Sequence, residues 1–266
     1  MQQTPEHRRI RTRAIRPRPA QRTLAWRFPL HQNVRNTYST YIAQLIFQQI
    51  NDSPIHGGFS DGQEWDAVWP LLVAHHVLIP DHPAHGRSLE IKPLEINDAT
   101  RRLASLIEAK AQKLIAHVVA ISIGAHVAAA MAAQYPERVQ TLIVSGFNLF
   151  ASNLVSPILP YLVYAAQRGR GYLSTTCDIF NILFSSRDLE PITARSLVVA
   201  ATRGISADNV SHSRRLFETV MDNGSRLVQH RGMRHPWNAD EPQLFANMVM
   251  SWIMGEDLPD GFESIP

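Results

Sequence analysis

Short apolar runs alternate with amphipathic stretches along most of the chain, and this pattern sets the expected fold. Three β-branched, apolar runs predict buried strands at Val118–Ile121, Thr141–Ser145 and Leu197–Ala201. Leucine and isoleucine recur at helical spacing in Asp98–Lys113, so we expect a helix there with Asp98 as its N-cap. Further elements are expected at Ala125–Ala133, about Asn209–Met221 and about Pro242–Met254 (helices) and at Arg226–Gln229 (strand). This alternation predicts an α/β fold with a mainly parallel central sheet flanked by helices.

The pattern is less regular before residue 90. Asn51–Pro54 predicts a turn, because proline and polar residues are poor material for a central strand. A helix that carries tryptophan is expected over Glu64–Ala74, followed by a short strand at Val77–Ile79. This part of the chain therefore leaves open how the sheet begins.

The stretch His117–Ala133 gives the clearest indication of chemistry. A buried strand runs directly into Ser122, which is followed by Gly124 and an alanine-rich helix. Strand, serine and helix in this order are typical of a nucleophile elbow, in which a strained turn exposes the serine hydroxyl. The alternative is a buried serine in an ordinary strand–helix turn, and Ala120 occupies a position where glycine is usual in the elbow.

Composition and charge divide the chain into a basic N-terminal segment and a mildly acidic body. Residues 1–40 carry nine arginines and one glutamate, and the rest carries 17 of the 26 basic and 22 of the 23 acidic residues. An acidic body does not suit a nucleic-acid binder. We expect residues 1–40 to be a basic, disordered extension, with a mitochondrial presequence as the alternative.

The remaining features concern compartment and domain organisation. Cys177 is the single cysteine, which excludes an intramolecular disulfide and fits a reducing, cytoplasmic compartment. No apolar run approaches 18 residues without a charge, and no apolar segment follows the N-terminus, so neither a membrane span nor a secretory signal is expected. The length of 266 residues suits one α/β core, built from 41–148 and 196–266. The insert 149–195 is expected to form a helical lid, or alternatively a structural helical excursion.

With these segments in order, the chain resembles the α/β-hydrolase superfamily from about Ile55 to Trp252. Four local matches carry the resemblance. They are His56-Gly57-Gly58, similar to the family's oxyanion loop, then Asp81-His82-Pro83-Ala84-His85-Gly86-Arg87-Ser88, then the Ser122 elbow, and Tyr135-Pro136-Glu137-Arg138-Val139.

The resemblance implies a set of site residues. Ser122 would be the nucleophile and His235, in the loop before the last helix, its base. The family's acid usually lies near the position of Gly204, but the first carboxylate after the strand is Asp208, which could instead be only a helix N-cap. Glu218 and Asp178 are distant substitutes for the acid. The implied oxyanion donors are the backbone N–H groups of Ile123 and of Gly58 or Phe59.

The implied function is hydrolysis of an ester, thioester or lactone bond in a small hydrophobic substrate through an acyl-enzyme on Ser122. No cofactor or metal is expected, since His75, His76, Asp81 and His85 lack the spacing of a metal site. A non-hydrolytic protein of the same fold, such as a lyase, an isomerase or a small-molecule binder, is the alternative, and a pseudoenzyme is another. The sequence leaves the oligomeric state open.

Overall fold

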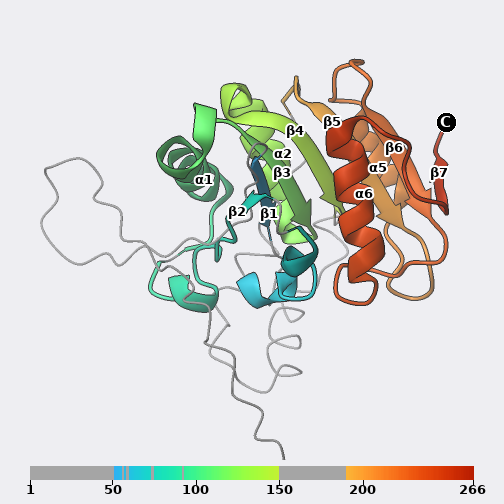
Figure 1. Cartoon of the computed structure of the whole chain (residues 1–266), viewed down its shortest axis with the longest axis horizontal. Coiled ribbons are helices and arrows are strands. Elements are labelled where there is room, and N and C mark those ends of the chain that lie inside the picture. The colour runs from blue at the N-terminus through green and yellow to red at the C-terminus, as the bar shows by residue number, and fades with distance from the viewer. Residues whose placement is uncertain (1–50, 56, 58–59, 73–74, 92, 150–189) are drawn as a thin grey trace, which may run out of the picture.

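A seven-stranded sheet forms the centre of the structure, a computed structural model that describes residues 51–55, 57, 60–72, 75–91, 93–149 and 190–266 (Figure 1). The strands are β1 (Asn51–Ile55), β2 (His76–Val77), β3 (Ala116–Ile121), β4 (Val139–Ser145), β5 (Arg195–Ala201), β6 (Arg226–His230) and β7 (Phe262–Ser264). Their order is β2-β1-β3-β4-β5-β6-β7, and each neighbouring pair is parallel except β6 with β7. The expected α/β fold with a mainly parallel sheet is confirmed.

Helices connect the strands and pack on the sheet (Figure 1). The α-helices of the described residues are α1 (Ile96–Lys110), α2 (Ile123–Gln134), α5 (Val210–Phe217) and α6 (Pro242–Met254). Single 3₁₀ turns lie at η1 (Gly62–Trp65), η2 (Trp69–Leu72), η3 (Gly86–Ser88), η4 (Gln112–Leu114) and η5 (Pro136–Arg138). The bounds of α6 are those the sequence pattern predicts, with proline at the first helical position.

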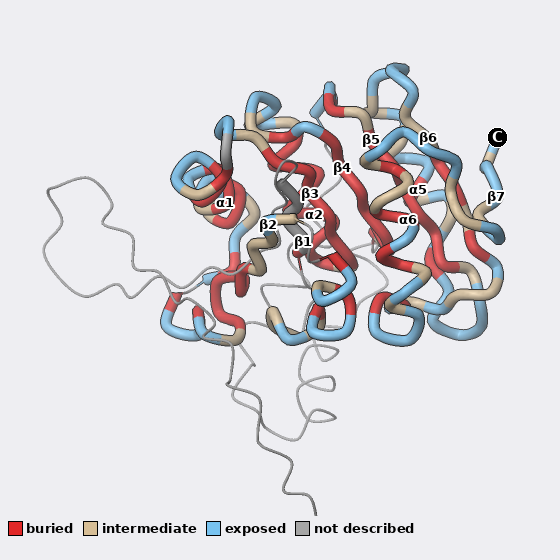
Figure 2. The backbone as a smooth tube through the Cα atoms, viewed as in Figure 1, coloured by how far each residue is buried: buried red, intermediate tan, exposed pale blue. Residues whose placement is uncertain are grey.

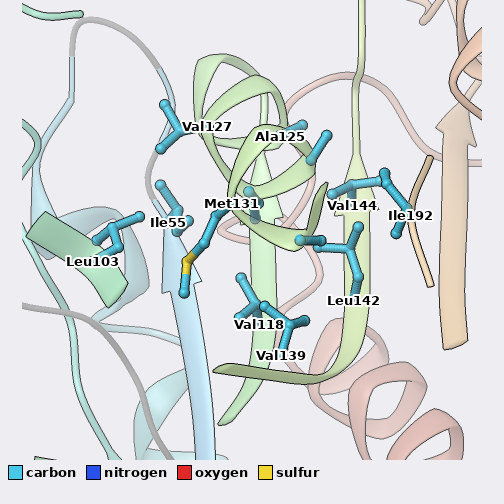
Figure 3. Close-up of a cluster of buried hydrophobic side chains, with 14 of the residues drawn as sticks. Ile55, Leu103, Val118, Ala125, Val127, Met131, Val139, Leu142, Val144 and Ile192 are labelled. Atoms are coloured by element: carbon cyan, nitrogen blue, oxygen red, sulfur yellow. The ribbon is translucent and has the colours of Figure 1, made fainter. Parts of the chain in front are cut away.

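The sheet is buried on both faces, which explains why its central strands are continuously apolar (Figure 2). Successive residues of β3 alternate between two core clusters. Val118 and Ala120 belong to the cluster that contains residues of α1 and α2, part of which Figure 3 shows. Val119 and Ile121 belong to the cluster that contains Trp65 and residues of α6. The two helical layers thus fix the strand that leads to Ser122.

The expected turn at Asn51–Pro54 is wrong, because these residues form β1. The register joins Asn51 and Asp52 to β2, while Asp52–Ile55 pair with β3. The pairing of β1 with β2 ends at Asp52, so beyond that residue this side of β1 has no strand to bond. Pro54 lies in this part of β1, and its missing N–H is therefore tolerated. Pairing between distant strands therefore overrides the local turn propensity.

Two helix predictions also need correction. The helix expected over Glu64–Ala74 is replaced by η1 and η2, because Pro70 lacks the N–H that a continuous α-helix would use. Asp98 is not the N-cap of α1, whose cap position is Glu95. Instead, Asp98 lies in the first turn and forms ion pairs with arginines three and four residues later.

Other bounds differ by a few residues. The strand expected at Val77–Ile79 is β2 at His76–Val77, and α5 ends at Phe217 rather than near Met221. The basic segment 1–40 and most of the insert 149–195 lie outside the described residues. Within the part of the chain that the structure describes, no helix has the length and apolar character that a membrane crossing requires.

A buried histidine, His117 on β3, makes the stability of the sheet depend on pH. Its Nδ1 lies 2.7 Å from the Thr141 hydroxyl on β4. Burial, and secondly the positive charge of Arg195, lowers the pKa of His117 from 6.5 to about 4. The folded protein therefore holds this ring neutral at a pH where the unfolded chain would protonate it.

We expect the free energy of unfolding to be highest above about pH 6.5 and to fall as the pH drops toward about 4. Each pH unit in that window costs at most about 1.4 kcal/mol from this one residue. His117→Gln removes the titration, and so it should lose less stability between about pH 7 and pH 5, by up to about 2 kcal/mol. Guanidinium unfolding at the two pH values measures this, and equal losses in both proteins would contradict it.

Candidate active site

Ser122 occupies a strained turn between β3 and α2. Its backbone angles are φ 57° and ψ −124°, and a non-glycine residue at positive φ costs about 1–2 kcal/mol. Two backbone hydrogen bonds hold the turn. The Ser122 N–H donates to the Ser145 carbonyl at the end of β4 (2.9 Å), and the Ala125 N–H donates to the Ser122 carbonyl (2.9 Å). The side chain of Ser122 is thereby fixed at the carboxyl end of the sheet, partly exposed.

Small residues surround this turn. A Cβ atom built on Gly57 would lie 3.2 Å from the Ser122 Cβ, so the loop after β1 approaches the serine closely. Ala120, which replaces the usual glycine, is fully buried in β3, and the core accommodates its methyl group. The turn therefore tolerates alanine at this position.

Glu64 holds the loop that follows β1 through hydrogen bonds. Its Oε2 accepts the Gly57 N–H at 2.7 Å and lies 2.6 Å from the Ser60 hydroxyl, which donates to it. The Glu64 carbonyl in turn accepts the Asn238 side-chain amide at 3.3 Å. One residue thus ties the loop beside Ser122 to the segment that follows His235. Nothing in the sequence pattern singled out Glu64, because its hydrogen bonds follow no recognised spacing and Asn238 is 174 residues away.

Asp81 stabilises the loop before η3 by accepting hydrogen bonds from two backbone N–H groups. Its two buried carboxylate oxygens accept the N–H groups of Gly62 (2.7 Å) and Arg87 (2.8 Å). Ala84, where the family pattern has glycine, takes the left-handed conformation with φ 63°. The described part of the chain holds no group of three or more His, Cys, Asp or Glu side chains arranged to bind a metal.

Asp208 is brought back to the end of β5 by the loop that follows that strand. The Asp208 N–H donates to the Ala201 carbonyl (2.8 Å), and the Ala201 N–H donates to Asp208 Oδ2 (2.7 Å). Residues 202–207 form a loop between these paired groups, so a carboxylate seven positions along the chain lies at the strand end. Its side chain is fully buried. The N-cap of α5 is Asn209, whose side chain accepts the Ser211 N–H, and the alternative role of Asp208 as that cap is wrong.

His235 lies in the loop between β6 and α6, facing Asp208. Its Nδ1 is 3.2 Å from Asp208 Oδ1, which is within ion-pair distance but does not have hydrogen-bond geometry. The His235 N–H donates to the Ser206 carbonyl (3.2 Å), and the buried Trp237 ring donates to the Ser145 hydroxyl (3.0 Å). The loop carrying His235 is therefore attached both to the Asp208 loop and to the end of β4.

Gly146 provides the space for the His235 ring. Its φ is 74°, and a Cβ atom there would overlap Nδ1 and Cε1 of His235 and lie 3.3 Å from Asp208 Oδ1. Gly146 directly follows Ser145, whose carbonyl holds the Ser122 turn. The ends of β3, β4 and β5 thus bring Ser122, His235 and Asp208 to one edge of the sheet.

The remaining candidates are the oxyanion donors and the two alternative acids. Ile123 is the buried first residue of α2, so its N–H has no acceptor within the helix. Gly58, Phe59 and Asp178 lie outside the described residues. Glu218 is the exposed C-cap of α5, whereas the Asp208 carboxylate is the one that faces His235.

Comparison with known proteins agrees with this architecture. Residues 55–248 match the family described as the alpha/beta hydrolase family. The chain belongs to the α/β-hydrolase family. A protein named AB hydrolase superfamily protein from Gibberella zeae is 59% identical over 233 residues, which cover 80% of this chain and 83% of that protein.

Solved structures share the α/β-hydrolase fold at low sequence identity. A thermophilic esterase from Thermogutta terrifontis has a TM-score of 0.60 at 14% identity and covers 80% of this chain and 98% of its own. The monoacylglycerol lipase from Paleococcus ferrophilus has a TM-score of 0.56 at 16% identity, covering 74% and 93%. A meta-cleavage product hydrolase from Pseudomonas fluorescens has a TM-score of 0.56 at 17% identity, covering 81% and 98%. Hydrolases of several kinds are thus similar to this chain in fold.

Two glycines with the same backbone conformation allow a matched test of the space beside His235. Gly146→Ala should abolish activity, because the new methyl group overlaps the imidazole and must displace it. Gly204→Ala has the same φ of 74° but meets nothing within 4 Å. It should keep full activity and lose only about 1–2 kcal/mol of stability from the left-handed strain.

Ester hydrolysis rates and chemical unfolding of both variants measure these effects. Equal activity in the two alanine variants would contradict the expectation that hydrolysis needs the His235 ring in the position above Gly146.

Proposed function

We propose that this α/β hydrolase is a serine hydrolase that cleaves an ester, thioester or lactone bond through an acyl-enzyme on Ser122. The single observation that carries the proposal is the Asp208–His235 pair, held at the end of the sheet where the strained Ser122 turn also lies. A neutral serine hydroxyl is a poor nucleophile and needs an adjacent base. The pair supplies that base together with the group that orients it.

In the proposed reaction, His235 takes the proton of the Ser122 hydroxyl while the oxygen attacks the substrate carbonyl. Asp208 keeps Nδ1 protonated and leaves Nε2 as the acceptor, and it stabilises the imidazolium that forms. The imidazolium returns its proton to the leaving alcohol, thiol or hydroxyl as the carbon–oxygen or carbon–sulfur bond breaks. A water molecule, activated by the same histidine, then hydrolyses the acyl group from Ser122.

The developing oxyanion needs two positioned N–H donors. We assign one to Ile123, whose N–H is at the start of α2, and the other to Gly58 or Phe59. Gly57 is a poor candidate, because its N–H already donates to Glu64 at 2.7 Å. That same bond supports the assignment to the next residues, since it anchors the loop that carries them.

We further propose that the substrate is small and hydrophobic and that the insert 149–195 forms a lid over the site. The aromatic and aliphatic composition of the insert supports this assignment, as does its position between β4 and β5, whose carboxyl ends carry the site. Lipases and esterases among the similar structures favour ester substrates. A p-nitrophenyl ester with a short acyl chain is the natural first substrate.

Ser122→Ala should abolish ester hydrolysis and labelling by a fluorophosphonate probe while leaving the melting temperature nearly unchanged. Only a partly exposed hydroxyl is lost, and alanine experiences the same backbone strain at φ 57°. Ser264→Ala, at an exposed serine on β7, is the control and should retain both activities. Persistent turnover by the Ser122 variant would show that another group is the nucleophile. Absence of both ester turnover and probe labelling in the parent protein would favour a non-hydrolytic or binding role for the site.

Asp208→Asn should lower turnover by roughly 10⁴-fold, because the amide would favour the wrong tautomer of His235. The side-chain oxygen of asparagine can still accept the Ala201 N–H, so the fold should persist with a loss of about 1–3 kcal/mol. Asp257→Asn, at an exposed position after α6, controls for the loss of a negative charge. Comparable rates for the Asp208 variant and its control would remove Asp208 from the proposed site.

A further inference from the structure

Asn148, three residues beyond Ser145, bonds both to Asp208 and to the residue that follows it. Its amide nitrogen donates to Asp208 Oδ1 at 3.1 Å. Its amide oxygen accepts the Asn209 N–H at 2.8 Å. The oxygen that receives the amide N–H is the same one that lies 3.2 Å from His235 Nδ1. One carboxylate oxygen is therefore shared between the asparagine and the histidine.

The segment that carries Asn148 is itself held firmly. The ring of Phe147 stacks on His126 of α2, with 4.2 Å between centroids. The Leu149 N–H donates to His212 Nδ1 on α5 at 2.9 Å. Asn148 is thus anchored through both chain neighbours, and its two bonds to Asp208 and Asn209 have a rigid base.

We infer that Asn148 is a positioning residue that fixes the Asp208 carboxylate toward His235 and takes up part of its negative charge. The inference rests on the proposed function, in which His235 is the base. Asp208 Oδ2 is held by the Ala201 N–H and Oδ1 by Asn148, so the carboxylate cannot rotate away from the histidine. The donated hydrogen bond also weakens the pull of the carboxylate on a protonated imidazole. Without this donor, more of the negative charge of the carboxylate would act on the His235 ring.

Two histidines, His126 and His212, also lie beside the Asn148 segment. Burial lowers the pKa of His126 to about 3 and also lowers the pKa of His212, so both rings beside the Asn148 segment are neutral near pH 7. On the outer side of the His235 loop, Arg234 pairs with Asp240, and Arg203 donates to a backbone carbonyl. A change at Asn148 therefore acts chiefly through the Asp208–His235 pair.

Two variants separate the two bonds of Asn148. Asn148→Asp keeps an oxygen for the Asn209 N–H but loses the donor to Asp208 and adds a negative charge. Asn148→Leu, which has the same branching at Cγ but no polar side-chain atom, loses both bonds. Asn247→Asp is the control, because Asn247 is exposed on α6 and its oxygen accepts a hydrogen bond from Gln243 that aspartate preserves.

The measurements are the pH profile of kcat/KM with a p-nitrophenyl ester and an NMR titration of the His235 ring, identified by comparison with His235→Gln. Both Asn148 variants should move the acid limb and the NMR midpoint to higher pH by about half a unit to one unit, while Asn247→Asp leaves them unchanged. The value of kcat should fall on the order of tenfold, with KM changed less than twofold. If Asn148→Leu does not fold, Asn148→Asp decides alone.

A change in Asn148→Leu only would mean that the bond to Asn209 matters and would overturn the inference. No shift, or a shift to lower pH, in both variants would overturn it as well. The NMR titration separates this inference from the proposed function. An upward shift in a protein that cleaves no ester supports the role of Asn148 and rejects hydrolysis. If the midpoint of the His235 NMR titration is unchanged in the Asn148 variants while the fluorophosphonate probe labels Ser122, the role of Asn148 is rejected and hydrolysis is supported.

Discussion

The buried carboxylate of Asp208 is the interaction on which the site depends. A carboxylate removed from water needs partners for its oxygens, and here the Ala201 N–H, the Asn148 amide and His235 Nδ1 surround it. These partners come from the end of β5, the segment after β4 and the loop after β6. A single charge thus fixes the relative positions of three loops that are far apart in the sequence.

The sheet supplies the rigidity that these loops need. Because the ends of parallel strands meet at one edge, β3 presents Ser122 beside β4, and the Ser145 carbonyl holds the Ser122 turn. Ser145 also accepts the hydrogen bond from Trp237, two residues after His235. The conformation at Gly146 then leaves room for the imidazole. The strained serine turn persists because the strand and helix on either side of it are almost wholly buried.

Periodic and local features of this fold could be predicted from sequence, whereas long-range pairings could not. The apolar spacing predicts the buried strands β3 and β4 and the amphipathic helix α6. The strained turn at Ser122 is predicted by a strand that runs directly into an alanine-rich helix. β1 was missed because its pairing with β3 outweighs the turn propensity of Asn51–Pro54. Glu64 and Asn148 were missed because their hydrogen bonds do not recur at any spacing, and Asn148 reaches a partner 60 residues away. The short antiparallel β7 likewise depends on pairing with β6 rather than on a pattern of its own.

The proposed function requires that Ser122 becomes acylated during turnover. Rapid acid quenching during hydrolysis of a p-nitrophenyl butyrate substrate, followed by mass spectrometry of the digested protein, tests it most directly. A butyryl group is expected on the peptide that contains Ser122, formed in the first turnover and absent when substrate is exhausted. A butyryl group on another residue, or continued release of p-nitrophenol with no modified peptide, would contradict it.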